Sequence, residues 1–473
     1  MVKSEKDAYD VIIIGAGIGG LVCGCYLAKA GMKVLIVEQH FKPGGYCTSF
    51  KRKGYTFDAA PHCFGSYRNG GIAQKIFQDL GLDKMLTIMR PDPSDTIITP
   101  NYNISFWNDL AKTTYEFQAS FPKEKENIKR FFDLLIDTDP RSFSGMRSRT
   151  FKQLVDEYFM DDKLKAILSI PFLGIGGLPA SMMSAFVGAK LYSEFLFDGG
   201  YYPHGGMQAI PDALTQRFKE AGGEMRLSTL ATKIKLKDNA VIGIVVNNNQ
   251  FIPSKCVVSD CDARQTFLKL LGKGKLDSEF HDMLKKMIPS ISTFILYLGI
   301  QHSDDLPKQG TTFSFFSHYD IERAYQALNK GDLAGYGGYM LRTSHDRATM
   351  IAMMPAKYKN KAYWIRNKHH FTEKFIGMIQ KNSIPDFSKY ILFKDAATPH
   401  TLSRYTLNYK GASFGWASIP SQLTIPSLRK PSFIQGLYLC GHWTTLGIGV
   451  SGAAYVGKDT AKIILRKNKK IFP

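Results

Sequence analysis

The sequence predicts an α/β fold in which a Rossmann-type nucleotide-binding domain is assembled from three separated segments. Three observations predict it. A glycine-rich turn separates two strand-length apolar runs near the N-terminus, short alternating strands follow a helix near the middle, and a strand, a glycine-rich turn and a helix end the sequence. The predicted nucleotide-binding segments are residues 1–68, 201–290 and 411–473. A mixed α/β substrate domain with a helical cap is predicted between them, at 69–200 and 291–410.

The composition excludes several classes of protein. The chain has 473 residues, 44% of them hydrophobic and 22% charged, which excludes intrinsic disorder and collagen-like or disulfide-stabilised scaffolds. Seven cysteines are an odd number without the paired spacings of a zinc site, so we expect reduced thiols and no metal. The formal charge of +20 suits nucleic acid or an anionic membrane surface.

The N-terminal residues predict a βαβ unit. Asp10–Ile14 and Lys33–Val37 are apolar runs typical of strands buried on both faces, and a helical pattern between them stops at Gly31. The turn holds Gly15, Gly17 and Gly20, a spacing that lets the backbone approach a pyrophosphate at a helix N-terminus. Glu38 follows the second strand, where a carboxylate can accept hydrogen bonds from ribose hydroxyls.

The remaining elements are predicted from periodicity and turn residues. Helices are expected around residues 128–135, 151–158, 210–218 and 449–465, and strands at 55–58, between 224 and 259, and at 294–301, 351–354, 390–394 and 437–440. Gly174-Ile175-Gly176-Gly177 has no helix start behind it and is expected to be a loop, so no second dinucleotide such as NAD is predicted.

Two uncharged stretches, 11–28 and 166–189, are long enough to be checked as membrane spans. Five glycines interrupt the first, and Pro171, Pro179 and four glycines interrupt the second. We therefore expect buried or interfacial elements. Met182, Met183, Phe186 and Phe195 are candidates for lining an apolar slot.

A longer motif resembles a known family. The run from Gly44 to Asp58, GGYCTSFKRKGYTFD, is similar to the bacterial-type phytoene desaturases, the carotenoid isomerases and the retinol saturases, within the FAD-dependent amine-oxidase-like superfamily. The resemblance continues at 202–206, 221–224, 405–408, 437–441 and 447–454, in the family's order.

This resemblance implies an FAD site. The implied contacts are Gly15, Gly17 and Gly20 with the pyrophosphate, Glu38 with the adenosine ribose, Gly44 and Gly45 beneath the phosphates, the Ala231 backbone with adenine, and Gly441, Gly449 and Val450 with the flavin. Two residues depart from the family pattern. Tyr46 stands where desaturases often have arginine, and His442 stands where many members have an acidic residue.

The resemblance also implies an FAD-dependent oxidoreductase acting on a long hydrophobic polyene or isoprenoid. Desaturation by hydride transfer to flavin N5 is the first choice, with oxygen or a quinone as electron acceptor. A saturase or cis-trans isomerase using reduced FAD is the close alternative. A flavin amine oxidase and a flavin-free, prenyl-protein-binding relative of the fold are more distant ones. His62 and His442 are weak candidates for moving protons, and Tyr202 and Trp443 for walling the flavin.

A lipophilic substrate favours the membrane interpretation of the positive charge. The last helix carries basic residues from Lys458 to Lys470, which predicts a cytoplasmic protein bound peripherally to an anionic membrane. No nucleic-acid-binding motif accompanies the charge, so no nucleic-acid partner is expected. The sequence leaves the oligomeric state open.

Overall fold

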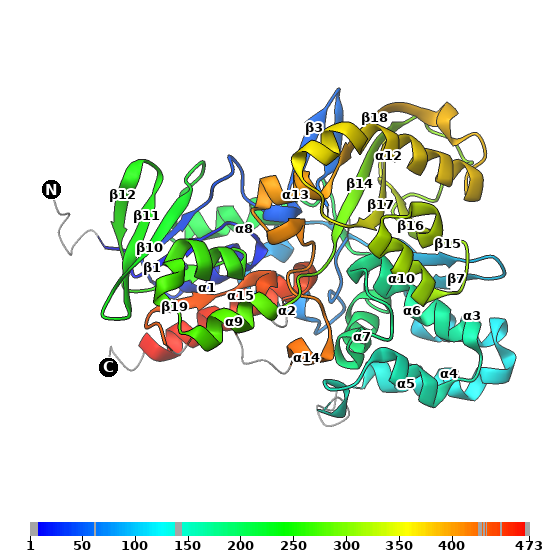
Figure 1. Cartoon of the computed structure of the whole chain (residues 1–473), viewed down its shortest axis with the longest axis horizontal. Coiled ribbons are helices and arrows are strands. Elements are labelled where there is room, and N and C mark those ends of the chain that lie inside the picture. The colour runs from blue at the N-terminus through cyan, green and yellow to red at the C-terminus, as the bar shows by residue number, and fades with distance from the viewer. Residues whose placement is uncertain are drawn as a thin grey trace.

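A computed structural model describes residues 8–60, 63–137, 144–423, 428, 431, 433–444 and 447–468. Two large sheets dominate it and lie side by side along the longest axis (Figure 1). A five-stranded sheet and its helices form one half, and a seven-stranded sheet with a helical layer forms the other. The predicted α/β class is confirmed.

The first sheet is wholly parallel, with the strand order β19–β13–β1–β2–β9. Its strands are β1 Val11–Ile14, β2 Val34–Val37, β9 Glu224–Arg226, β13 Val257–Ser259 and β19 Leu437–Leu439. Every residue of β1 and β2 is buried, as expected for strands covered on both faces. Neighbouring strands come from distant parts of the chain, so three chain segments build one sheet.

Different layers cover the two faces of this sheet. Val11 and Ile13 pack with the helices α1 Ile18–Lys29, α2 Ile72–Leu80, α8 Ala209–Glu220 and α15 Gly449–Asn468. Ile12 and Ile14 pack with the antiparallel strands β10 Ala231–Lys237, β11 Ala240–Val246 and β12 Gln250–Pro253, with the π-helical turn Gln265–Gly272 and with α9 Ser278–Lys286. This alternation is the two-residue period of a strand.

The second sheet has the order β18–β14–β17–β16–β15–β6–β7. Its strands are β6 Asp95–Ile98, β7 Asn103–Phe106, β14 Ser292–Ile300, β15 Thr312–Phe316, β16 Gly338–Thr343, β17 Thr349–Ala356 and β18 Ile391–Ala397. All pairs are antiparallel except β6 with β15, which run parallel. The parallel pair joins an early hairpin to the later strands.

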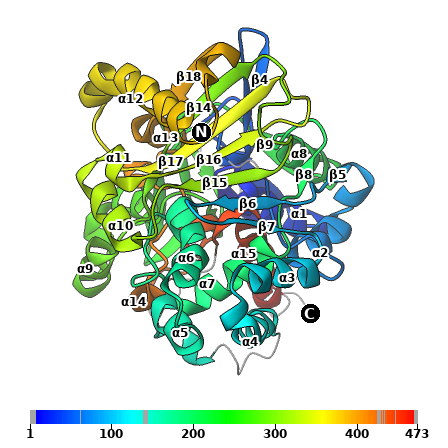
Figure 2. The ribbon, with the colours of Figure 1, turned by 90° about the vertical axis from the view of Figure 1, so that its right-hand side faces the viewer.

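Helices surround the second sheet. In Figure 2, α3 Leu110–Ser120, α4 Lys125–Ile136, α5 Phe151–Tyr158, α6 Asp162–Gly176 and α7 Ala185–Leu191 gather below β6 and β7. The remaining helices of this half are α10 Ile321–Lys330, α11 Leu333–Tyr336, α12 Lys361–Asn382 and α13 Pro399–Thr406, and the short α14 Pro420–Leu423 follows. One continuous apolar core joins the cap helices to the sheet.

The uncharged stretch 166–189 is a buried part of this cap. Pro171 lies inside α6, and most side chains from Ala166 to Leu173 are buried in the core. The loop expected at Gly174–Gly177 is wrong, because Gly174 and Gly176 belong to the last turn of α6 and Gly177 caps it with a φ of 61°. Within the described ranges, no helix combines the length and the apolarity that crossing a membrane requires.

A buried carboxylate joins two of the separated segments. Asp58 ends β4 Tyr55–Asp58, which pairs with β3 Ser49–Arg52. It accepts hydrogen bonds from Ser49 Oγ at 2.7 Å, from Tyr202 Oη at 2.6 Å and from the Met207 N–H at 2.9 Å. Tyr202 lies on β8 Tyr202–Pro203, which pairs with β5 Ile88–Met89. Asp58 thus holds the start of the second nucleotide-binding segment against the first.

Replacing Asp58 tests this junction. Asp58→Ala leaves three donors without their acceptor in the protein interior, so we expect the free energy of unfolding in urea to fall by about 3 kcal/mol. Asp58→Asn keeps one acceptor oxygen and should lose less. The exposed Asp83→Ala is the matched control and should stay within about 0.5 kcal/mol of the native chain. Equal stability of Asp58→Ala and the control would show that the junction contributes nothing.

Candidate functional site

A cavity of 1360 Å³ runs between the two halves of the molecule. Its wall begins at the glycine turn after β1, passes Glu38 and the Gly44–Gly45 pair, and continues to apolar residues of the second sheet and of α7. Gly15, Gly17, Glu38, Gly44, Gly45, Ala231, Gly441, His442, Gly449 and Val450 all line it. The structure therefore brings together these predicted site residues from three chain segments.

The glycine turn is shaped for a close approach of the backbone. Gly15 has a φ of +103°, a conformation that favours glycine, and Gly17 precedes α1 without any side-chain cap on that helix. Gly20 does not line the cavity. A Cβ there would lie 2.3 Å from the carbonyl oxygen of Gly15, so Gly20 allows α1 to pack against the end of β1.

Glu38 follows β2 directly and holds the backbone of the glycine turn through hydrogen bonds. Its two carboxylate oxygens accept hydrogen bonds from the N–H groups of Ala16 and His40, both at 2.8 Å. Burial raises the pKa of Glu38, and these N–H groups oppose the shift. The carboxylate faces the cavity where a ribose is expected to lie.

The Gly44–Gly45 pair passes beside the turn. The Gly44 N–H donates to the Ala16 carbonyl oxygen at 2.8 Å, and Gly44 bridges to Gly17. Gly44 has a φ of +124° and Gly45 a φ of +59°, so both positions suit glycine. Two glycine-rich segments therefore meet with no side chain between them.

A carboxyl that the sequence did not single out lies among these glycines. Asp260 directly follows β13, and a Cβ at Gly17 or Gly441 would lie 2.5 Å or 2.0 Å from one of its oxygens. Burial raises the pKa of Asp260 to about 7, although hydrogen bonds from the N–H groups of Gly20 and Gly17 act to lower it. A carboxyl with that pKa is partly protonated at neutral pH, which lessens its repulsion of a nearby pyrophosphate. In the sequence, the position of Asp260 at the carboxyl end of a buried strand is the one feature that could have indicated a site residue.

The C-terminal segment closes the same end of the cavity. Gly441 has a φ of +74°, and the N-terminal turn of α15, with Gly449 and Val450, opens on the cavity. Ser451 Oγ donates to the Gly65 carbonyl oxygen at 2.6 Å, which ties this helix to the segment after β4. The helix N-terminus thus presents its positive dipole end to whatever the cavity holds.

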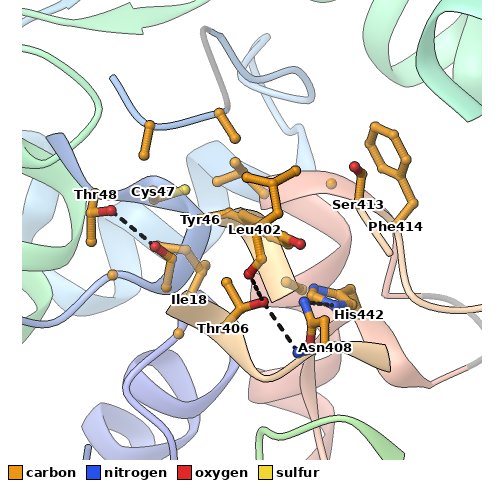
Figure 3. A pocket seen from close by; sticks show the side chains of 18 of the residues that line it. Ile18, Tyr46, Cys47, Thr48, Leu402, Thr406, Asn408, Ser413, Phe414 and His442 are labelled. Atoms are coloured by element: carbon orange, nitrogen blue, oxygen red, sulfur yellow. Dashed lines mark hydrogen bonds between the residues drawn. The ribbon is translucent and has the colours of Figure 1, made fainter. Parts of the chain in front are cut away.

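His442 lies beside Tyr46 on this wall (Figure 3). The two rings are stacked with centroids 5.9 Å apart. Trp443 Nε1, which can only donate, binds Asn408 Oδ1 at 2.8 Å, so Asn408 Nδ2 faces His442 Nε2 at 3.3 Å. The His442 proton is therefore on Nδ1.

Burial lowers the pKa of His442 to about 4, so the imidazole is neutral at physiological pH. It offers a hydrogen-bond donor at Nδ1, while Asn408 occupies the lone pair of Nε2. His62, the other histidine candidate, lies outside the described residues.

Two aromatic candidates are placed elsewhere. Trp443 is buried in the core of the first half with its ring 4.9 Å from that of Trp416, and Tyr202 binds Asp58. Neither belongs to the cavity wall. Trp443 Nε1 donates to Asn408 and Tyr202 Oη donates to Asp58, and apolar patterns in the sequence do not reveal such buried hydrogen bonds.

The far part of the cavity is largely apolar. Phe186 and Phe195 line it as predicted, whereas Met182 and Met183 pack in or against the core of the cap and do not reach the wall. Other apolar side chains of this part include Val187, Leu191, Ile295, Met340 and Met353.

The arrangement fits FAD. The glycine cradle has no room for a Cβ at Gly17 or Gly441, the Glu38 carboxylate faces the adjoining space, and the N-terminus of α15 opens on the same cavity. These are the groups that hold a pyrophosphate, a ribose and an electron-rich ring.

Comparisons with known proteins agree with this fit. A family model described as "Flavin containing amine oxidoreductase" matches residues 18–315. The chain is 25% identical to the phytoene desaturase (neurosporene-forming) of Rhodobacter capsulatus, covering 98% of this chain and 95% of that one. It is 24% identical to the chloroplastic prolycopene isomerase of Daucus carota, covering 95% and 78% of the two chains. It is 23% identical to the all-trans-retinol 13,14-reductase of Danio rerio, covering 97% and 86%.

Solved structures share the fold. An oxidoreductase from Methanosarcina mazei superposes with a TM-score of 0.68 at 18% identity, covering 96% of this chain and 99% of that one. A putrescine oxidase bound to putrescine gives a TM-score of 0.68 at 14% identity, covering 97% and 99%. The chain therefore shares its overall fold with these two proteins of known structure.

Gly17→Ala tests the cradle. Its added Cβ would lie 2.5 Å from the Asp260 carboxylate, so the turn must shift away from the bound pyrophosphate. We expect the purified variant to lose at least about tenfold in FAD affinity, measured as flavin absorbance per protein and by titration with FAD. Gly377→Ala is the control, because that exposed glycine of α12 has free space around its Cα. Full flavin content in Gly17→Ala would contradict the assigned cradle.

Proposed function

The chain belongs to the flavin containing amine oxidoreductase family, and we propose that it is an FAD-dependent oxidoreductase that desaturates a long lipophilic polyene or isoprenoid. The observation that carries the proposal is the single cavity that joins the glycine cradle to an apolar compartment. The names of the three relatives, which concern phytoene, prolycopene and retinol, support the substrate class.

The chain's own residues supply position and environment. When bound, FAD supplies a two-electron acceptor for the hydride that leaves one substrate carbon while the neighbouring carbon loses a proton. Gly15, Gly17 and Glu38 fix the cofactor, and the apolar wall holds the substrate and excludes water. His442 stays neutral and donates through Nδ1, so it acts as an orienting donor and takes up no proton at neutral pH.

Oxygen or a quinone is proposed as the final electron acceptor. The saturase or isomerase alternative uses reduced FAD in the same cavity, and the isomerase and reductase relatives keep it open. The flavin-free alternative is disfavoured because the glycine cradle and Glu38 are intact. The amine oxidase alternative is supported by the description of the family model and by the fold shared with a putrescine oxidase.

Anaerobic mixing distinguishes the reactions. We expect the yellow protein to bleach when phytoene is added without oxygen, with one double bond formed for each FAD reduced, because oxidation of the substrate delivers both electrons to the flavin. Absorbance of flavin and products followed in one cuvette measures this. Conversion that needs previously reduced FAD would instead establish saturation or isomerisation. A purified protein without flavin absorbance would contradict the enzyme assignment.

We also propose that the substrate is taken from an anionic membrane surface, with the protein cytoplasmic and bound peripherally. The net charge of +20 and the apolar cavity support this. Not every basic residue of α15 is available to a membrane. Lys458 forms an ion pair with Asp79 at 2.5 Å, whereas Lys462 and Arg466 are exposed. Lys469 and Lys470 lie outside the described residues.

Sedimentation with vesicles tests the membrane proposal. We expect co-sedimentation with phosphatidylglycerol vesicles that falls steeply as salt is raised, and little with phosphatidylcholine vesicles. The double variant Lys462→Glu/Arg466→Glu should bind at least about thirtyfold more weakly, since each cation contributes about 1 kcal/mol near such a surface. Lys374→Glu/Lys381→Glu, with the same change of charge on exposed positions of α12, is the control. Binding to the vesicles that changes neither with salt nor with the substitutions in α15 would refute electrostatic membrane binding through this helix.

A further inference from the structure

Asp260 presents a carboxyl group to the part of the cavity that the glycine cradle forms. It directly follows β13, is half-buried and lines the cavity. Its N–H donates to the Ile14 carbonyl oxygen at 2.8 Å, which holds its backbone at the end of β1. A Cβ at Gly17 would lie 2.5 Å from Asp260 Oδ2, and a Cβ at Gly441 would lie 2.0 Å from Oδ1. The two carboxyl oxygens therefore lie against both glycine-rich turns.

The carboxyl group uses hydrogen-bond donors that a pyrophosphate would need. The N–H groups of Gly17 and Gly20 donate to it, and both belong to the N-terminal turn of α1. N–H groups at a helix N-terminus have no partner within the helix, and in a turn of this kind they hold phosphate oxygens. An ionised Asp260 thus competes with an incoming pyrophosphate for the same donors.

The groups around Asp260 do not supply a compensating positive charge. The titratable side chains that face it are Glu38 after β2, Cys23 of α1, Cys440 after β19 and the adjacent Cys261. Burial raises the pKa of each of the three thiols, so they are neutral at physiological pH. Cys440 Sγ donates to Asp260 Oδ1 at 3.6 Å. Glu38 is itself an acid, so a carboxylate at Asp260 would add repulsion between anions when a pyrophosphate enters.

We propose that Asp260 is an FAD-binding residue that holds the pyrophosphate as a neutral acid, so that binding of FAD takes up one proton. Without FAD, the carboxylate accepts the hydrogen bonds of the α1 N–H groups. With FAD, the carboxyl O–H donates to a phosphate oxygen and the N–H groups of Gly17 and Gly20 turn to the same anion. The proton comes from solvent and stays on Asp260, and no covalent bond to the cofactor forms.

The proposal fixes the direction of the pH dependence. Burial, with a smaller contribution from Glu38, raises the pKa of Asp260 to about 7 in the protein without cofactor. A neighbouring anion raises this pKa further in the complex. Below about pH 7 the acid is already protonated, and FAD binds without taking up a proton. Above that pH each binding event takes up a proton, so the dissociation constant for FAD rises by up to about tenfold per pH unit.

Titration of the FAD-depleted full chain with FAD tests the proposal. We expect a dissociation constant, measured by flavin fluorescence, that is at least about tenfold higher at about pH 8.5 than at about pH 6. Calorimetry in two buffers of different ionisation enthalpy counts the protons. It should give about one proton taken up per FAD at the higher pH and close to none at the lower. An affinity that does not change with pH, or binding without proton uptake at the higher pH, would overturn the proposal.

Three variants assign the proton to its residue. Asp260→Asn carries a neutral N–H donor at every pH, so it should bind FAD at the higher pH more tightly than the native chain and without proton uptake. Glu38→Gln should bind FAD more weakly at every pH but keep the native slope. Asp83→Asn, the same change at an exposed position, should behave as the native chain does. Circular dichroism and thermal unfolding report whether each variant is folded.

Other outcomes with these variants would contradict the assignment. A native slope in Asp260→Asn would place the proton on another group, and loss of the slope in Glu38→Gln would place it on Glu38. Weak binding of FAD by folded Asp260→Asn at every pH would reject the role of a neutral donor.

This inference goes beyond the proposed function, because it depends on FAD binding and not on the substrate. Failure of every polyene to bleach the flavin would reject desaturation and leave the proton uptake in place. Flavin bleaching by phytoene in a protein whose FAD affinity is independent of pH would leave the oxidoreductase standing and remove the role of Asp260.

Discussion

The nucleotide-binding half depends on the close approach of one carboxyl to three glycines. Asp260 lies after β13, Gly17 and Gly20 after β1, and Gly441 after β19. A Cβ at these glycines would come within 2.5, 3.1 and 2.0 Å of Asp260. The carboxyl ends of three parallel strands can therefore meet at this edge only if the three positions stay without side chains. The same packing leaves the N-terminus of α1 free to face a phosphate.

The cavity lies where two halves built from interleaved chain segments meet, and residues of both halves line it. The first half contributes backbone, a carboxylate and a helix N-terminus, and the second half contributes apolar side chains. Asn408 contacts two neighbouring side chains at the cavity. Trp443 Nε1 donates to its Oδ1, so its Nδ2 faces His442 Nε2 and the His442 proton lies on Nδ1. A polar end and an apolar end thus share one cavity, which suits chemistry on a lipophilic molecule.

Much of the fold could be predicted because its signals are local. The buried strands at 11–14 and 34–37 and the helix at 18–29 follow from apolar runs and from the glycines that bound them. The prediction was wrong at Gly174–Gly177, where burial in the cap carries α6 through glycines that disfavour helix. Apolar periodicity also left Met182 and Phe186 equivalent, although only Phe186 reaches the cavity. Periodicity says that a side chain is buried and does not say against what.

The sequence by itself determined the glycine turn, the carboxylate after the second strand and the strand–helix pairs at both ends. Each depends on backbone rules that act within a few residues, such as the freedom of glycine at positive φ. Only the tertiary structure decided that Asp260 lies against Gly441 and that Asp58 accepts a hydrogen bond from Tyr202. Those contacts join positions far apart in the chain, and strand order and register, which no local pattern specifies, bring them together.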